Sequence, residues 1–194
     1  GQPHNGMAWA TYGPTAEVFR DFTQAGVTLY TFSGTPTEAG YGLSKTTWTA
    51  PDQFDYSEFD QRVLMLLNVN PHAYFFPRLY LHAPKWWSDR HPDDVVLTDP
   101  GDGRPRPFIH SGGKPAPSWA SETWRRDTAA ALRRMVAHIE ASPYADRVVE
   151  VVALLAEMGP HPLAQVPQGA AEEIQVQGIP GKGGLPADGL GCGQ

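Results

Sequence analysis

Short apolar runs alternate with amphipathic runs along residues 7–156. β-branched and aromatic residues are concentrated in 7–12, 27–33, 73–81 and 147–156, and these four runs are predicted to be strands. Between them, apolar residues recur at the spacing of one helix face. Strands that alternate with helices in this way are typical of a parallel α/β architecture.

Polar residues suited to capping a helix N-terminus precede each amphipathic run. Thr15 precedes a first predicted helix, which ends near Gly26. Asp55 or Ser57 starts a second helix over 54–67, and Ser121 starts a third over 121–141. The two long connections, 34–53 and 82–120, each follow a strand and precede a helix. Long loops at this position are frequently functional.

This pattern fits either a doubly wound sheet or part of a closed barrel. A doubly wound sheet is expected to carry a Gly-rich phosphate turn after its first strand, and none follows 7–12. Loops that follow strands lie at the C-terminal face of a barrel, where barrel active sites are built. The predicted fold is therefore α/β, as about the first four units of a (β/α)₈ TIM barrel.

The character of the chain changes after residue 159. From Pro160 to Gln194 there is no aromatic residue, and Gly, Pro and Gln dominate without periodicity. Such a segment buries too little apolar area to offset its ordering entropy. We therefore assign 1–159 to the barrel part and expect 160–194 to be a disordered or non-native tail.

Composition excludes several partners. The chain has 194 residues and a net charge of −6. This charge argues against a nucleic acid or an anionic membrane as a partner, because both bind basic surfaces. No apolar run is long enough to span a bilayer. The single cysteine, Cys192, excludes an internal disulfide and a cysteine zinc site. No cofactor is predicted, and the compartment stays open.

The loop after the third strand contains Trp86 and Trp87 next to each other. Neighbouring side chains in a loop point in different directions, so at least one indole is expected to be accessible. An indole packs well against the C–H patches of a sugar. The alternative is that both residues only close the rim of the barrel.

Arg78 lies inside an otherwise apolar strand. A buried guanidinium requires carboxylate partners, so Arg78 either contacts a catalytic carboxylate, pairs with a structural Asp, or reaches solvent at the strand end. His82, with Asp89 and His91, matches no zinc-ligand spacing, so no metal site is predicted. The predicted substrate-binding residues are Arg78, His82, Trp86 and Trp87.

Glycoside hydrolysis requires two carboxyl groups on either side of the scissile bond. The fourth strand offers Glu150 and Glu157, and Glu157 is the better placed for a general acid. The alternative for Glu157 is an ordinary loop glutamate. No second carboxylate with a comparable position follows it.

Three segments resemble bacterial β-galactosidase-like proteins related to glycoside hydrolase family 42. PRLYLHAPKWWSDRHPDD (77–94) is similar to their third strand and following loop, and WTAPDQFDYSEFD (48–60) to their approach to the second helix. The most specific match is PSWASETWRRDTAAALRRMVAHIEASPYADRVV (117–149), which leads into strand four. The resemblance covers about 7–149. It implies a (β/α)₈ barrel that hydrolyses β-galactosides with retention, with the acid/base glutamate at the end of strand four and the nucleophile at the end of strand seven.

The chain departs from that family pattern after about residue 150. The family's Glu-Trp pair is absent from 148–165, and Pro160 stands about where the acid/base glutamate is expected. A tail that is not native coding sequence, as a frameshift would produce, explains the departure.

The sequence therefore predicts a glycosidase fragment that is inactive alone, with self-association through unpaired strand edges. The alternatives are a non-catalytic carbohydrate-binding or scaffold protein, and an unrelated α/β domain that docks a protein.

Overall fold

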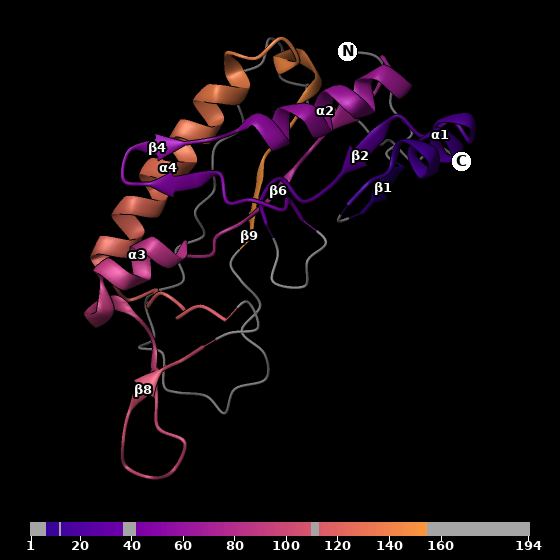
Figure 1. Ribbon diagram of the computed structural model, residues 1–194. Coiled ribbons are helices and arrows are strands. Elements are labelled where there is room, and N and C mark those ends of the chain that lie inside the picture. The colour runs from indigo at the N-terminus through magenta and orange to yellow at the C-terminus, as the bar shows by residue number, and fades with distance from the viewer. Residues whose placement is uncertain (1–6, 12, 37–41, 110–112, 155–194) are drawn as a thin grey trace, which may run out of the picture.

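Short parallel strands form the centre of the protein. The computed structural model describes residues 7–11, 13–36, 42–109 and 113–154 (Figure 1). One parallel sheet has the order β1 (Ala8–Ala10), β2 (Leu29–Thr31) and β5 (Tyr74–Phe75). A second parallel pair joins β6 (Arg78–Tyr80) to β9 (Val152–Leu154). The architecture of the described residues is mixed α/β.

The predicted strand 73–81 is divided into β5 and β6 at Pro77, which has no N–H to donate to a ladder. The interruption is local. The backbone N–H of Arg78 donates to the carbonyl of Phe32 at 2.8 Å, and that of Val152 donates to the carbonyl of Pro77 at 3.0 Å. The parallel ladder therefore continues from the end of β2 across β6 to β9, and the strand segments are neighbours in chain order.

Two predicted helix starts are confirmed by their capping hydrogen bonds. The helix α1 (Ala16–Gln24) follows Thr15, whose Oγ1 accepts from the backbone N–H of Val18 at 3.3 Å. The helix α4 (Glu122–Glu140) follows Ser121, whose Oγ accepts from the N–H of Trp124 at 3.0 Å. Each bond satisfies an N–H that has no partner inside the helix.

The helix α2 (Ser57–Val69) begins three residues later than predicted. Asp55 Oδ1 accepts from the backbone N–H of Ser57 at 2.9 Å, so of the two predicted caps Asp55 supplies the hydrogen bond. Of the four apolar residues expected on its inner face, Phe59, Val63 and Leu66 are buried, whereas Leu67 is partly buried against the same core.

The two predicted loops contain regular structure. The first holds an antiparallel hairpin of β3 (Trp48–Ala50) and β4 (Gln53–Phe54). The second, predicted as a long loop over 82–120, contains the helix α3 (Lys85–Arg90), the 3₁₀ turn η1 (Pro92–Asp94) and the hairpin of β7 (Leu97–Thr98) with β8 (Arg106–Pro107). A further 3₁₀ turn, η2 (Ala145–Arg147), precedes β9.

Aromatic side chains from the helices and strands fill the main core. Phe19 of α1 and Phe59 of α2 are fully buried with Tyr30, Phe32 and Phe75 of the strand layer. Their rings pack at centroid distances of 4.2 Å for Phe19 with Tyr30 and 6.0 Å for Phe32 with Phe59. This packing fixes α1 and α2 against the strands.

Several expectations lie beyond this description. The last described residue is Leu154. The structure therefore does not describe Glu157, the tail 160–194, or the part of the departure 148–165 that follows residue 154. β1 and β9 each pair with one strand in the described part, and self-association through their edges stays a prediction. None of the described helices combines the length and the hydropathy that a membrane-spanning segment needs.

The end of β2 allows a test of this packing. A Cβ added at Gly34 would lie 2.7 Å from Leu79 Cδ2 and 3.0 Å from Phe59 Cε2. We expect Gly34→Ala to lower the free energy of unfolding by about 1–3 kcal/mol, because overpacking displaces both neighbours. Urea unfolding followed by circular dichroism measures this change.

The companion variant is Leu79→Ala, which removes the closer of the two atoms. In the double variant, Gly34→Ala should cost less than it does alone, because the new methyl group occupies the vacated space. Strict additivity of the two free energies would contradict the proposed contact.

Candidate functional site

A cavity of about 350 Å³ lies at the carboxyl ends of β2 and β6. The β3–β4 hairpin and one side of α4 complete its walls. Aromatic side chains from the hairpin region and α4 line it, together with hydroxyl groups from the loop after β2. These are Trp48, Phe54, Tyr56 and Trp124, and Thr35, Ser44, Thr46 and Thr47. His82 and Lys114 are the titratable nitrogen groups of the lining.

A carboxylate of α2 fixes the loop that forms one wall. Glu58 accepts hydrogen bonds from the backbone N–H of Ser44 at 2.7 Å, from Ser44 Oγ at 3.0 Å, and from the N–H of Lys45 at 3.0 Å. Burial raises the pKa of Glu58, but these bonds outweigh it and hold the pKa below its usual value. The carboxylate is therefore ionised at neutral pH and is used to hold the loop.

Arg62, one helical turn further along α2, secures the same loop at two other points. Its guanidinium donates to the carbonyl of Ser33 at 3.1 Å and to the carbonyl of Gly42 at 3.2 Å. The two ends of the segment after β2 are thereby attached to one rigid helix. This arrangement positions the wall from behind without placing either charge in the cavity lining.

The ends of β2 and β6 are joined directly at the cavity. Thr35 Oγ1 accepts from the backbone N–H of Tyr80 at 2.7 Å. The Tyr80 ring lies parallel to the imidazole of His82, with 6.0 Å between the ring centroids. Burial, and then the nearby positive charge of Lys114, lower the pKa of His82, so its imidazole is neutral at pH 7. A neutral imidazole has both a donor and an acceptor.

Trp48 is the centre of the aromatic wall. Its ring stacks on Phe54 at 6.1 Å and meets Trp86 edge-on at 4.9 Å. Trp86 Nε1 also donates to the carbonyl of Trp48 at 3.0 Å. Within the described structure, Trp48 Nε1 and the hydroxyl of Tyr56 are buried without a hydrogen-bond partner.

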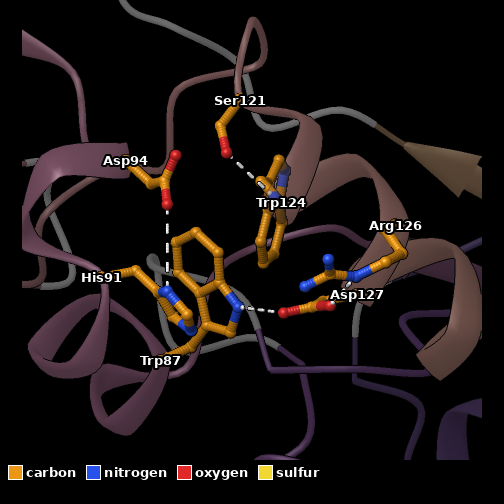
Figure 2. A network of polar contacts seen from close by, with 7 residues as sticks. All are labelled: Trp87, His91, Asp94, Ser121, Trp124, Arg126 and Asp127. Atoms are coloured by element: carbon orange, nitrogen blue, oxygen red, sulfur yellow. Dashed lines mark hydrogen bonds and ion pairs between the residues drawn. The ribbon is translucent and has the colours of Figure 1, made fainter.

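Trp87 corrects one sequence expectation, because it belongs to the core. Its side chain is 0% exposed, and its Nε1 donates to Asp127 Oδ2 at 3.0 Å (Figure 2). The indole lies edge-on against Trp124, with 4.9 Å between centroids. Successive residues of a helix point about 100° apart, so in α3 one tryptophan faces inward while its neighbour stays half-buried.

The four predicted binding residues do not converge on one site. His82 lines the larger cavity, whereas Trp86 lines a neighbouring cavity of about 220 Å³ that shares Trp48 and Phe54 with it. Arg78 is outside both linings, and its guanidinium donates to the carbonyl of Thr11, just after β1. The predicted catalytic Glu157 lies outside the described residues.

Sequence reasoning missed Trp48, Tyr56 and Lys114 as lining residues. A signal existed for the first two, because aromatic residues flank a Pro-Asp pair in WTAPDQFDY, which is typical of a turn between strands. Asp52 at that turn has φ of 56°, a left-handed conformation that Asp tolerates. Lys114 has no such signal, since only the return of the chain after β8 brings it to His82.

The described part of the chain contains no group of three or more His, Cys, Asp and Glu side chains placed to hold a metal ion. The lining of the larger cavity offers one imidazole and no carboxylate among those residues. The chemistry that it supports directly is hydrogen bonding and aromatic packing.

The sequence matches no protein-family model and no curated protein. Among solved structures, a polyextremophilic β-galactosidase from the Antarctic haloarchaeon Halorubrum lacusprofundi aligns with 76% of this chain at 17% identity, with a TM-score of 0.48. The chain spans 20% of that protein's length. The class that the described residues themselves define is a mixed α/β protein with parallel strands and a cavity at their carboxyl ends.

The hydrogen bond between Trp87 and Asp127 can be tested by substitution. Asp127→Ala is expected to lower the free energy of unfolding by about 1–3 kcal/mol, because a buried indole N–H loses its acceptor. Asp127→Asn keeps an acceptor oxygen and should cost less. Urea unfolding followed by circular dichroism measures both changes.

Asp93→Ala is the matched control, because Asp93 is exposed on the neighbouring turn η1. It should change stability by less than about 0.5 kcal/mol. Asp127→Ala also removes a pair with the exposed Arg126, which contributes little. Equal stabilities for the Asp127→Ala and Asp93→Ala variants would show that the bond does not hold α3 to α4.

Proposed function

We propose that the larger cavity binds a carbohydrate, and that the chain is the sugar-binding part of a β-galactosidase-like glycoside hydrolase. The observation that carries this proposal is the cavity at the carboxyl ends of two adjacent parallel strands, where aromatic faces and hydroxyl groups line the same space. Enzymes built on (β/α) barrels bind their substrates at this face.

The strand order supports a barrel as the complete fold. The parallel segments β1, β2, β5–β6 and β9 are neighbours in chain order, joined by the ladder through Arg78 and Val152. A doubly wound sheet instead reverses its strand order at the ligand site. We therefore propose that these segments are the first four strands of a (β/α)₈ barrel.

The lining chemistry suits a sugar. Aromatic rings such as Trp48 and Tyr56 offer flat surfaces to the C–H faces of a pyranose. The neutral imidazole of His82, which lines the cavity, is a hydrogen-bonding group suited to a sugar hydroxyl. The hydroxyl groups of Thr35 and Ser44, which are already held by Tyr80 and Glu58, provide further polar contacts at fixed positions.

A second candidate is a non-catalytic carbohydrate-binding protein. It is favoured by one observation, which is that the cavity lining has no Asp or Glu among the described residues. Hydrolysis with retention needs two carboxyl groups about 5 Å apart. Catalysis would therefore depend on carboxylates such as Glu157 that lie outside the described structure.

Isothermal titration calorimetry with galactose tests binding. We expect a measurable Kd for the unaltered chain and an increase of about tenfold in His82→Ala, which is the loss of roughly one good hydrogen bond. His72→Ala is the matched control, since His72 is exposed and lies outside both cavity linings. Galactose that binds with the same Kd to the chain and to both variants would remove His82 from the proposed site.

Hydrolysis of a chromogenic β-galactoside separates the two candidates. We expect no turnover by this chain, because the described cavity supplies no pair of carboxylates. Turnover that is lost in Glu157→Gln would contradict this expectation and would identify Glu157 as part of a working site. Circular dichroism of the variant confirms that any loss is not due to unfolding.

A further inference from the structure

We infer that the cavity takes an acidic sugar, a hexuronate or its glycoside, whose carboxylate pairs with Lys114. This inference deepens the proposed carbohydrate-binding function and rests on it. The observation behind it is the charge of the lining. Lys114 is the one residue in the described lining with a permanent charge, and no Asp or Glu lines the cavity with it.

The carboxylate that bonds the lining residue Ser44 is already engaged. Glu58 accepts three hydrogen bonds from Ser44 and Lys45, on the α2 side of the loop, and is not part of the lining. It therefore holds the loop and does not neutralise Lys114 in the cavity. Among the described residues, Lys114 forms no ion pair, whereas Lys85 is paired with Asp89 at 2.7 Å.

Lys114 lies close to His82 in the cavity lining. Both residues line the cavity, and the positive charge of Lys114 contributes, after burial, to the lowered pKa of His82, so the two groups are close. Lys114 is half-buried, so part of the residue lies out of solvent, where charges are screened less. An anionic group bound there gains a charge-assisted hydrogen bond, roughly twice as strong as a neutral one.

The remaining walls select a sugar over a simple anion. A hexuronate carries its carboxylate at one end of a pyranose ring that has a C–H face for Trp48 and hydroxyl groups for His82 and Thr35. The ligand can thus contact the aromatic wall and the cation together. The chain has a net charge of −6 and repels acidic molecules in general, so the local cation is what would admit this one.

Calorimetry with galactose and galacturonate, on the full chain, tests the inference. We expect galacturonate to bind about tenfold more tightly than galactose at low salt. In Lys114→Gln the preference for galacturonate over galactose should disappear, so that the two sugars bind with similar Kd. Lys85→Gln is the matched control, because it removes a lysine that is exposed and already paired with Asp89; it should leave the preference intact.

The outcomes separate this inference from the proposed function. Equal affinity of the two sugars for the unaltered chain overturns the acidic-sugar inference and leaves carbohydrate binding standing. Binding of neither sugar overturns both. Acetate serves as the anion without a sugar ring: competition by acetate as strong as that by galacturonate would mean a general anion site and would also overturn the inference.

Discussion

The hydrogen bond from Trp87 Nε1 to Asp127 Oδ2 fixes the part of the structure on which the cavity depends. It joins α3 to α4 over 3.0 Å, next to the edge-on packing of Trp87 on Trp124 (Figure 2). Because Trp87 is fixed inward, its neighbour Trp86 is directed toward the β3–β4 hairpin, where it donates to the carbonyl of Trp48. This part-buried bond therefore helps to fix the hairpin and α4, which both line the larger cavity, relative to one another, and it gives a small helix of six residues a defined orientation.

The opposite wall has a different physical basis. Within the described residues 34–36 and 42–47 of the loop after β2, Leu43 is the buried apolar residue that joins the main core. Glu58 and Arg62 of α2 compensate by binding backbone groups at both ends of the loop. Hydrophobic packing on one side and charged hydrogen bonds on the other thus hold the same cavity. Packing tolerates changes of salt, whereas the hydrogen bonds of a partly exposed carboxylate are weakened by it.

The parts predicted well from sequence are those governed by local rules. Thr15 and Ser121 cap their helices because a hydroxyl group one residue before a helix satisfies the same N–H in any fold. The strand over 73–81 was predicted without its interruption, although Pro77 was visible in the sequence. The burial of Trp87 does not follow from the sequence, because a helix of six residues within 82–120 has too short a periodic pattern to be recognised. The sequence identifies the strand that contains Arg78 and the loop that begins at His82, but it does not tell which of the two residues a cavity reaches.

The charge of the cavity could not be predicted because it arises from segments that are distant in the sequence. Lys114 reaches the lining after the chain has passed through α3 and the β7–β8 hairpin, while the carboxylate of Glu58 is held behind the loop by Ser44 and Lys45. The net charge of −6 predicts that the chain repels anions, whereas the proposed site would bind one. A ligand is selected by the potential where it binds, and a half-buried cation there outweighs surface anions that solvent and salt screen. In the proposed site, a neutral His82 and a charged Lys114 would be complementary, because the imidazole would contact hydroxyl groups of the sugar and the ammonium its carboxylate.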